Sequence, residues 1–280
     1  MKKTKFFTLL FAAALSPLLL NAQQAPSAVP EEGEAAPKST RPKQTDKASN
    51  QLINNYLAVT GSKQAHSNLR NVVATGTIEE AGRIRKFKLV ETQDGKRKVT
   101  YTWRHLGREH EVQYAFDGLQ SWSQEVKPKE KSSQSYGGQT GKHFQTQRWL
   151  LHPFVLPLSA SYVFKYQGLD KVYGRPTYVI VGYGKHDERS WFYFDQEKFL
   201  ITRWGGIGLI AGVEEYMDYS AIRFAKVNGV LLPKEIDLLA EGQPFGTISI
   251  DSIEANQVID STIFKRPASN IPVLRQRPVQ

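Results

Sequence analysis

The chain has 280 residues, a formal net charge of +10 and no cysteine. The absence of cysteine excludes a disulfide scaffold, a cysteine-ligated zinc or iron–sulfur site, a thiol nucleophile and a lipid anchor attached through cysteine. Hydrophobic residues make up 40% of the chain, which is ordinary for a soluble globular protein. Composition therefore favours a folded domain without covalent cross-links.

The first 22 residues have the pattern of a secretory signal peptide. Three lysines among the first five residues precede an apolar run at 6–20, and the small residue Ala22 follows it. A membrane-spanning helix needs about 20 apolar residues, so this run is short for a span, with an uncleaved anchor as the alternative. We therefore expect a periplasmic or secreted protein that is soluble once the signal is cleaved.

Residues 23–50 predict a disordered linker. They are rich in Pro, Ala, Ser and Gln, and they carry four acidic and four basic side chains. With so few apolar residues, such a segment cannot repay the entropy lost on folding. The folded domain is then expected at 51–268, followed by a short basic tail at 269–280.

The domain begins with helical patterns and continues with strand patterns. Apolar residues of 51–60 share one helical face, and a second short helix capped by Ser62 is expected to end near Leu69. After Arg70, short runs rich in Val, Ile, Thr, Tyr, Phe and Trp alternate in polarity. They predict strands at 71–78, 82–92, 161–169, 175–183, 189–195, 198–204, 212–224, 230–239 and 245–255, with further strands around Val99–Trp103 and Val112–Phe116.

Three dipeptides predict tight hairpin turns, namely Asp94-Gly95, Asp117-Gly118 and Asn228-Gly229. Strands joined in this way form an antiparallel meander. Residues 126–142 and 205–212 are polar or Gly-rich and predict loops, and 143–151 predicts a short helix ended by Pro153. The fold class is therefore mainly β with short helices.

Catalytic and ligand motifs fail on inspection. Gly206 to Ala211 matches a dinucleotide-binding pattern in letters, but the residues that follow alternate like a strand instead of forming a helix. The densest metal-like cluster is His105, Glu109, His110 and Glu111, in which His110 would point away from the others on a strand. The sequence therefore predicts no metal, no cofactor and no catalytic residue, and an enzyme whose site the pattern does not reveal is a third reading.

A basic segment lies on the strands at 82–104. Lys86 and Lys88 are expected to share one strand face, as are Lys96 and Lys98. A solvated sheet face explains them, and contact with an anionic partner, such as a lipid headgroup or an acidic protein surface, is the alternative. Nucleic acid is not expected as a partner because a secreted protein rarely meets it.

Aromatic residues suggest a ligand-binding face. If short helices do not fill the concave side of the sheet, a hydrophobic cavity remains there; the alternative is that the aromatics pack the core. The residues expected to line this cavity are Tyr101, Trp103, Tyr114, Phe116 and Trp122 on the sheet, with Trp149 on the covering helix.

Three stretches of the domain carry a family resemblance. They are the opening helix and first strand (53–61 and 69–76), the Asp-Gly turn with a tryptophan four residues later (115–122), and the closing strands (227–233, 250–256 and 259–264). With these stretches the domain resembles the LolA-like family, the periplasmic lipoprotein carriers and their relatives. The resemblance implies an unclosed β-barrel whose concave side is covered by helices, with a hydrophobic cavity for acyl chains or an apolar polypeptide segment and no cofactor.

The resemblance and the residues together predict a periplasmic, non-enzymatic carrier for lipoprotein acyl chains or lipid. We expect a monomer that meets a partner protein of the inner or outer membrane. An envelope sensor or protein-interaction module that uses the same sheet is the alternative.

Overall fold

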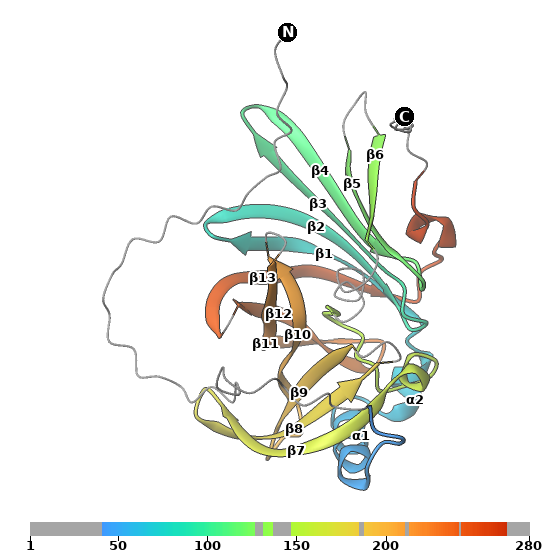
Figure 1. The fold of residues 1–280 in the computed structure, drawn as a ribbon, viewed down its shortest axis with the longest axis vertical. Coiled ribbons are helices and arrows are strands. Elements are labelled where there is room, and N and C mark those ends of the chain that lie inside the picture. Colours follow the sequence, from blue (N-terminus) through green and yellow to red (C-terminus); the bar gives the residue numbers. More distant parts are fainter. Residues whose placement is uncertain are drawn as a thin grey trace, which may run out of the picture.

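A computed structural model describes residues 41–126, 131–136, 147–184, 188–210, 213–240 and 242–267 (Figure 1). The predicted signal peptide at 1–22, most of the predicted linker and the basic tail lie outside these residues. Within the described part, no helix combines the length and the apolar character that a membrane span requires.

Thirteen antiparallel strands form one sheet, and its two end strands, β6 and β7, do not pair with each other. The order across the sheet is β6-β5-β4-β3-β2-β1-β13-β12-β11-β10-β9-β8-β7. The predicted fold class, a single curved antiparallel sheet that does not close into a barrel, is confirmed. The strands are β1 Asn71–Glu80, β2 Arg83–Thr92, β3 Arg97–His105, β4 Arg108–Phe116, β5 Ser121–Val126, β6 Lys131–Tyr136, β7 Val163–Val172, β8 Arg175–Tyr183, β9 Arg189–Asp195, β10 Ile201–Ile210, β11 Val213–Val227, β12 Val230–Ala240 and β13 Gln243–Ala255.

Local sequence explains most of these strands and turns. In β1, Val72, Ala74 and Ile78 are buried whereas Thr75 is exposed, as expected for a strand with one face on the core. All three predicted dipeptides lie in hairpin turns. At Asn228-Gly229 both residues have positive φ angles, 47° and 83°, which is the backbone conformation of a type I′ turn.

In the described part of the chain, two α-helices and two short 3₁₀ helices accompany the sheet: α1 Lys47–Val59, α2 Lys63–Asn68, η1 Leu158–Ser161 and η2 Ser261–Phe264. Asp46 caps α1 by accepting the Ser49 N–H at 2.7 Å, so the folded part begins inside the segment predicted as a linker. Ser62 caps α2, as predicted. Figure 1 shows both helices at one end of the curved sheet, where α1 contacts β7.

Two predicted loops are wrong because strands run through them. β6 occupies part of 126–142; its serines and Gln134 suit the polar edge of a sheet. β10 includes 205–210 of the Gly-rich stretch and pairs with β9 and β11. At Gly205 a Cβ atom would lie 2.3 Å from a carboxylate oxygen of Asp218 and 2.7 Å from the Trp191 indole nitrogen. Glycine there makes room for the hydrogen bond between these two side chains, which measures 2.5 Å.

The predicted helix at 143–151 is also absent where the structure describes it, since 147–151 have no helical conformation. In a helix the N–H groups of 149–151 would donate to carbonyls four residues earlier. Here they donate to the side chain of Glu91 instead. A distant carboxylate therefore replaces the local hydrogen bonds of the helix.

Candidate functional site

Residues 147–158, called here the inserted segment, lie against the concave face of the sheet. Five apolar side chains of this segment are buried and belong to the same core as α1 and the sheet: Trp149, Leu150, Leu151, Phe154 and Val155. The segment has almost no regular structure of its own before η1. Its conformation is therefore set by contacts with the sheet and with α1.

Glu91, at the end of β2, holds the backbone of the inserted segment. Its fully buried carboxylate accepts the N–H groups of Trp149 at 2.9 Å, Leu150 at 3.2 Å and Leu151 at 2.9 Å. It also pairs with the guanidinium groups of Arg97 at 3.2 Å and Arg148 at 4.0 Å. Burial alone raises the pKa of this carboxyl, but the two arginines and the N–H donors outweigh burial, so the pKa is lowered and Glu91 stays ionised.

Arg148, near the start of the inserted segment, binds backbone carbonyl groups, whereas Glu91 binds backbone N–H groups. Its guanidinium donates to the carbonyl oxygens of Leu151 at 2.6 Å, Gly95 at 3.0 Å and Thr92 at 2.7 Å. The Trp204 indole N–H of β10 donates to the Arg148 carbonyl at 2.8 Å. The backbone of 148–151 is thus bound through both its donors and its acceptors.

Aromatic contacts complete the packing of the inserted segment. The Trp149 ring meets the Phe87 ring edge-on at 5.3 Å, and the Arg97 guanidinium lies 5.0 Å from its centroid. Phe154 packs against Tyr56 of α1 at 5.6 Å and against Phe192 of β9 at 4.9 Å. Rings at these distances add dispersion and quadrupole attraction to the burial of their area.

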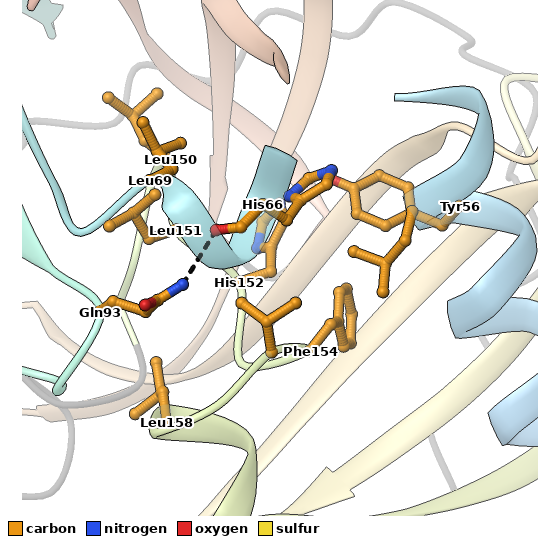
Figure 2. Close-up of a pocket in the computed structure, with 11 residues that line it drawn as sticks. Tyr56, His66, Leu69, Gln93, Leu150, Leu151, His152, Phe154 and Leu158 are labelled. Carbon is orange, nitrogen blue, oxygen red and sulfur yellow. Dashed lines mark hydrogen bonds between the residues drawn. The ribbon is translucent and has the colours of Figure 1, made fainter. Parts of the chain in front are cut away.

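A cavity of about 20 Å³ remains beside the inserted segment (Figure 2). Such a volume holds about one water molecule and no part of an acyl chain. Figure 2 shows Tyr56, His66, His152 and Phe154 around it, with the Gln93 amide donating to the His66 carbonyl at 2.9 Å. The concave face is therefore filled where the inserted segment lies, and a ligand could enter there only by displacing it.

Both histidines at this cavity are held in the neutral form. Burial lowers the pKa of His66 to about 4 and that of His152 to about 3. The Thr60 hydroxyl donates to the Tyr56 carbonyl at 2.6 Å, so in the 2.8 Å contact between Thr60 and His66 the His66 Nε2–H is the donor. These tautomer and charge states make the cavity wall uncharged.

Four of the five aromatic residues predicted to line the cavity from the sheet lie together on its concave side. Tyr101 and Tyr114 pack against the core with rings 6.1 Å apart, and the Arg85 guanidinium lies 5.0 Å from the Tyr101 ring. Trp103 follows on the same face of β3 and stacks on His110 at 5.2 Å. Phe116, which pairs with Arg97, is buried, whereas the other three are half-buried.

Trp122 was predicted on this concave face, but the structure places it on the outer face. It pairs with Ala115, while Ser121 and Ser123 pair with Phe116 and Tyr114 and share their side of the sheet. Its indole N–H donates to the Phe264 carbonyl at 2.7 Å, and its side chain is fully buried under the segment 256–267. Trp149 lies at the concave face on an irregular stretch, and not on the covering helix that the sequence predicted.

The four predicted lysines do not form one surface. Lys86 and Lys88 are exposed on the outer face of β2, where Lys98 of β3 joins them. Burial lowers the pKa of Lys98, with Glu111 opposing this and Lys88 adding to it. Lys96 is not on β3, because it lies in the preceding turn and pairs with Asp94 at 2.5 Å.

Sequence reasoning missed Glu91, Arg97 and Arg148, which organise the site. A signal for Glu91 was present, because it shares strand parity with the buried Phe87 and Leu89 and is therefore a charged residue at an inward position. Arg148 carries no such signal, since two of its three carbonyl partners lie more than fifty residues away. Within the described part of the chain, no three His, Cys, Asp or Glu residues are placed to hold a metal ion.

Comparison with known proteins gives neighbours among solved structures alone. No family model matches the chain, and no curated protein matches it. One similar structure is a DUF1329 family protein from Desulfovibrio piger, with 13% identity and a TM-score of 0.46, covering 79% of this chain and 98% of that one. Another is a LolA superfamily protein from Nitrosomonas europaea, with 10% identity and a TM-score of 0.47, covering 75% and 97%.

A third similar structure is a putative outer membrane lipoprotein-sorting protein domain from Vibrio parahaemolyticus. Its identity is 8% and its TM-score 0.48, with 77% of this chain and 95% of that one covered. All three TM-scores lie below 0.5. The function proposed below rests on the contacts within this chain.

Proposed function

We propose that the protein is a non-catalytic periplasmic carrier that binds an apolar ligand, such as lipoprotein acyl chains or lipid, on the concave face of its sheet. The observation that supports this is the inserted segment itself. An irregular stretch of the chain, rich in large apolar side chains, covers a face lined by aromatic residues. Such a face is suited to an apolar occupant, and in the structure its occupant is the chain's own segment.

Exchange of the inserted segment for a ligand is energetically reasonable. Exposing its five buried apolar side chains costs roughly 7–15 kcal/mol, at about 1.5–3 kcal/mol for each side chain. Burying an acyl chain of about 16 methylenes returns roughly 13 kcal/mol, at about 0.8 kcal/mol per methylene. The two terms are of similar size, so loading and release need no covalent step.

Lipid extraction and tryptophan quenching test this proposal. Protein purified from its native envelope should release lipid that mass spectrometry detects, and brominated palmitate should quench tryptophan fluorescence. The Trp103→Phe variant should lose part of this quenching because Trp103 lies on the concave side, whereas Trp122→Phe should not, because Trp122 lies on the outer face. Protein without lipid that brominated palmitate fails to quench would contradict the proposal.

A second candidate function, interaction with an anionic partner, is favoured by the outer face of β2 and β3. Lys88 and Lys98 are close enough there for Lys88 to lower the pKa of Lys98. Changing Lys86, Lys88 and Lys98 to Gln should weaken binding to vesicles that contain phosphatidylglycerol, most strongly at low salt. Lys96→Gln is the matched control because Lys96 is neutralised by Asp94. Equal effects of the triple and control variants would exclude this candidate.

A further inference from the structure

We infer that Glu91 and Trp204 form a peptide-binding subsite, at which the polypeptide part of a ligand replaces residues 148–151. This inference rests on the proposed function, because it too requires the inserted segment to be displaced. It adds a chemical class of ligand: a basic residue followed by an aromatic residue and aliphatic residues, bound through its backbone.

The first step of the argument is what Glu91 requires of any occupant. Three backbone N–H groups of the inserted segment converge on its two carboxylate oxygens. Hydrocarbon has no donor, so an acyl chain in this place would leave a buried carboxylate with Arg97 as its remaining partner. A buried charge that loses hydrogen bonds costs several kcal/mol. Glu91 therefore selects against hydrocarbon and for N–H donors at this position.

The second step concerns Trp204, which requires a hydrogen-bond acceptor from the occupant, whereas Glu91 requires donors. Its buried indole N–H donates to the carbonyl of Arg148 at 2.8 Å and would lose its partner if hydrocarbon took that place. An occupant must therefore bring an acceptor to Trp204 and donors to Glu91. Polypeptide backbone carries both kinds of group in regular succession.

The third step is the set of side-chain contacts around this backbone. The Arg148 guanidinium reaches the carbonyls of Thr92 and Gly95, which are partial negative charges that favour a cation. The Trp149 ring contacts both the Phe87 ring and the Arg97 guanidinium, and Leu150 is 2% exposed. A ligand segment with the same order of basic, aromatic and aliphatic side chains would make these contacts again.

The probe for this subsite is a synthetic peptide with the sequence of residues 147–153, blocked at both ends. The receptor is the full chain with Trp149→Ala, which weakens the hold of the inserted segment while leaving Glu91 and Trp204 in place. Calorimetry should show that the peptide binds this variant at least tenfold more tightly than it binds the unmodified chain. A peptide with glutamate in place of its arginine should bind at least tenfold more weakly.

N-methylation tests the role of Glu91 directly. A peptide methylated at the three amide nitrogens matching Trp149, Leu150 and Leu151 should lose at least tenfold in affinity. Methylation at the nitrogen matching Gln147 is the control and should have little effect. With Glu91→Gln added to the receptor, the methylated and unmethylated peptides should differ less. If that receptor fails to fold, Trp204→Phe replaces it and should weaken binding of the unmethylated peptide.

The outcomes separate this inference from the proposed function. Equal binding of the methylated and unmethylated peptides overturns the subsite. If the receptor binds brominated palmitate but does not bind the peptide, the subsite is also overturned, whereas the carrier proposal is still supported. If neither ligand binds and no lipid copurifies, the proposed function fails as well, and the inserted segment is a structural part of the core.

Discussion

At the scale of single residues, the neutral histidines at the small cavity make stability depend on pH. His66 and His152 have folded-state pKa values of about 4 and about 3, lowered by burial. In the unfolded chain a histidine titrates near pH 6.5, at about its ordinary value. Below that pH the histidines bind protons in the unfolded chain but not in the folded protein. Protonation of these two groups therefore leaves the free energy of unfolding unchanged above about pH 6.5. It lowers the free energy of unfolding progressively as the pH falls towards 4.

We predict that the free energy of unfolding falls by more than about 1 kcal/mol per pH unit between pH 6 and pH 4.5. Urea unfolding measured at several pH values gives this slope. The double variant His66→Gln, His152→Gln should have a flatter slope, whatever its absolute stability. His105→Gln is the matched control because His105 is exposed in the β3–β4 hairpin. A double variant with the slope of the unmodified chain would show that other groups dominate.

At the scale of elements, Asp46 joins the first helix to an edge of the sheet. One carboxylate oxygen accepts the Ser49 N–H that begins α1, and the other accepts the Tyr166 N–H of β7 at 2.7 Å. The Asp46 N–H also donates to the Phe164 carbonyl of the same strand at 3.2 Å, and the Phe164 N–H donates to the Thr45 hydroxyl at 3.0 Å. The N-terminal segment thus covers the open edge of β7, which would otherwise present unpaired groups to other chains.

We predict that Asp46→Ala lowers the free energy of unfolding by about 1–2 kcal/mol, the usual cost of losing an N-cap, with a further loss from the unpaired Tyr166 N–H. Asp46→Asn retains one acceptor and should lose less. Urea unfolding at pH 7 measures both variants, with Lys47→Ala as an exposed control at the next position. If Asp46→Ala and Lys47→Ala are equally stable, the cap contributes nothing.

The segment 256–267 is the element that covers the outer face. Phe264 is 2% exposed, and its carbonyl accepts the Trp122 indole N–H. Arg266 donates to the Ser133 carbonyl of β6 at 2.7 Å. Removing the Phe264 ring should detach this segment locally, because little else of it is buried in the sheet.

We predict that Phe264→Ala shifts tryptophan emission to longer wavelength as Trp122 meets water, and that it speeds cleavage of 256–267 by a protease. Val258→Ala is the matched control, since Val258 lies in the same segment and is fully exposed. Trp122→Phe combined with Phe264→Ala should abolish the spectral shift. A shift that persists without Trp122 would mean that the whole sheet has loosened.

At the scale of the whole molecule, local sequence predicts the sheet well because its determinants are local. β-branched and aromatic runs separated by Asn-Gly or Asp-Gly turns fix where strands begin and end. The prediction that was wrong is the face of the sheet on which Trp122 lies, because the alternation of side chains cannot be counted across a turn. The hairpin at Asp117-Gly118 closes through a hydrogen bond from Asp117 to Gln120, so Ser121 faces Phe116 and Trp122 turns outward. One residue more or less in that turn would reverse the face of every side chain in β5.

The site was harder to predict because its key contacts join residues about sixty positions apart. Glu91 binds the N–H groups of 149–151, and the sequence pattern around Glu91 or around 149–151 does not indicate that the two are in contact. The apolar pattern of 143–151 favours a helix by itself, and only the distant carboxylate makes an irregular conformation more stable. Tertiary contacts override local preference at this point.

This difference between local and distant contacts leads to a prediction about how the molecule opens. The central strands β12 and β13 are held by backbone ladders along both edges and by fully buried side chains such as Ile236 and Ile248. The inserted segment has no such ladder and is held by side-chain hydrogen bonds from Glu91, Arg148 and Trp204 and by packing. Regions with fewer cooperative backbone bonds open at lower free energy than the global unfolding transition. A carrier whose ligand replaces the inserted segment requires this partial opening.

We predict that amides of 149–151 exchange with solvent at least tenfold faster than those of β12 and β13, with a weaker dependence on urea. Hydrogen exchange followed by mass spectrometry measures both regions in one sample. Adding the blocked peptide of residues 147–153 should speed exchange in the inserted segment, because the peptide replaces 148–151 at Glu91 and Trp204, and leave β12 and β13 unchanged. Trp149→Ala should speed it further, whereas Val258→Ala, on the outer face, should not. If 149–151 exchange only when the whole sheet unfolds, and the peptide changes nothing, the inserted segment is a fixed part of the core and no ligand replaces it.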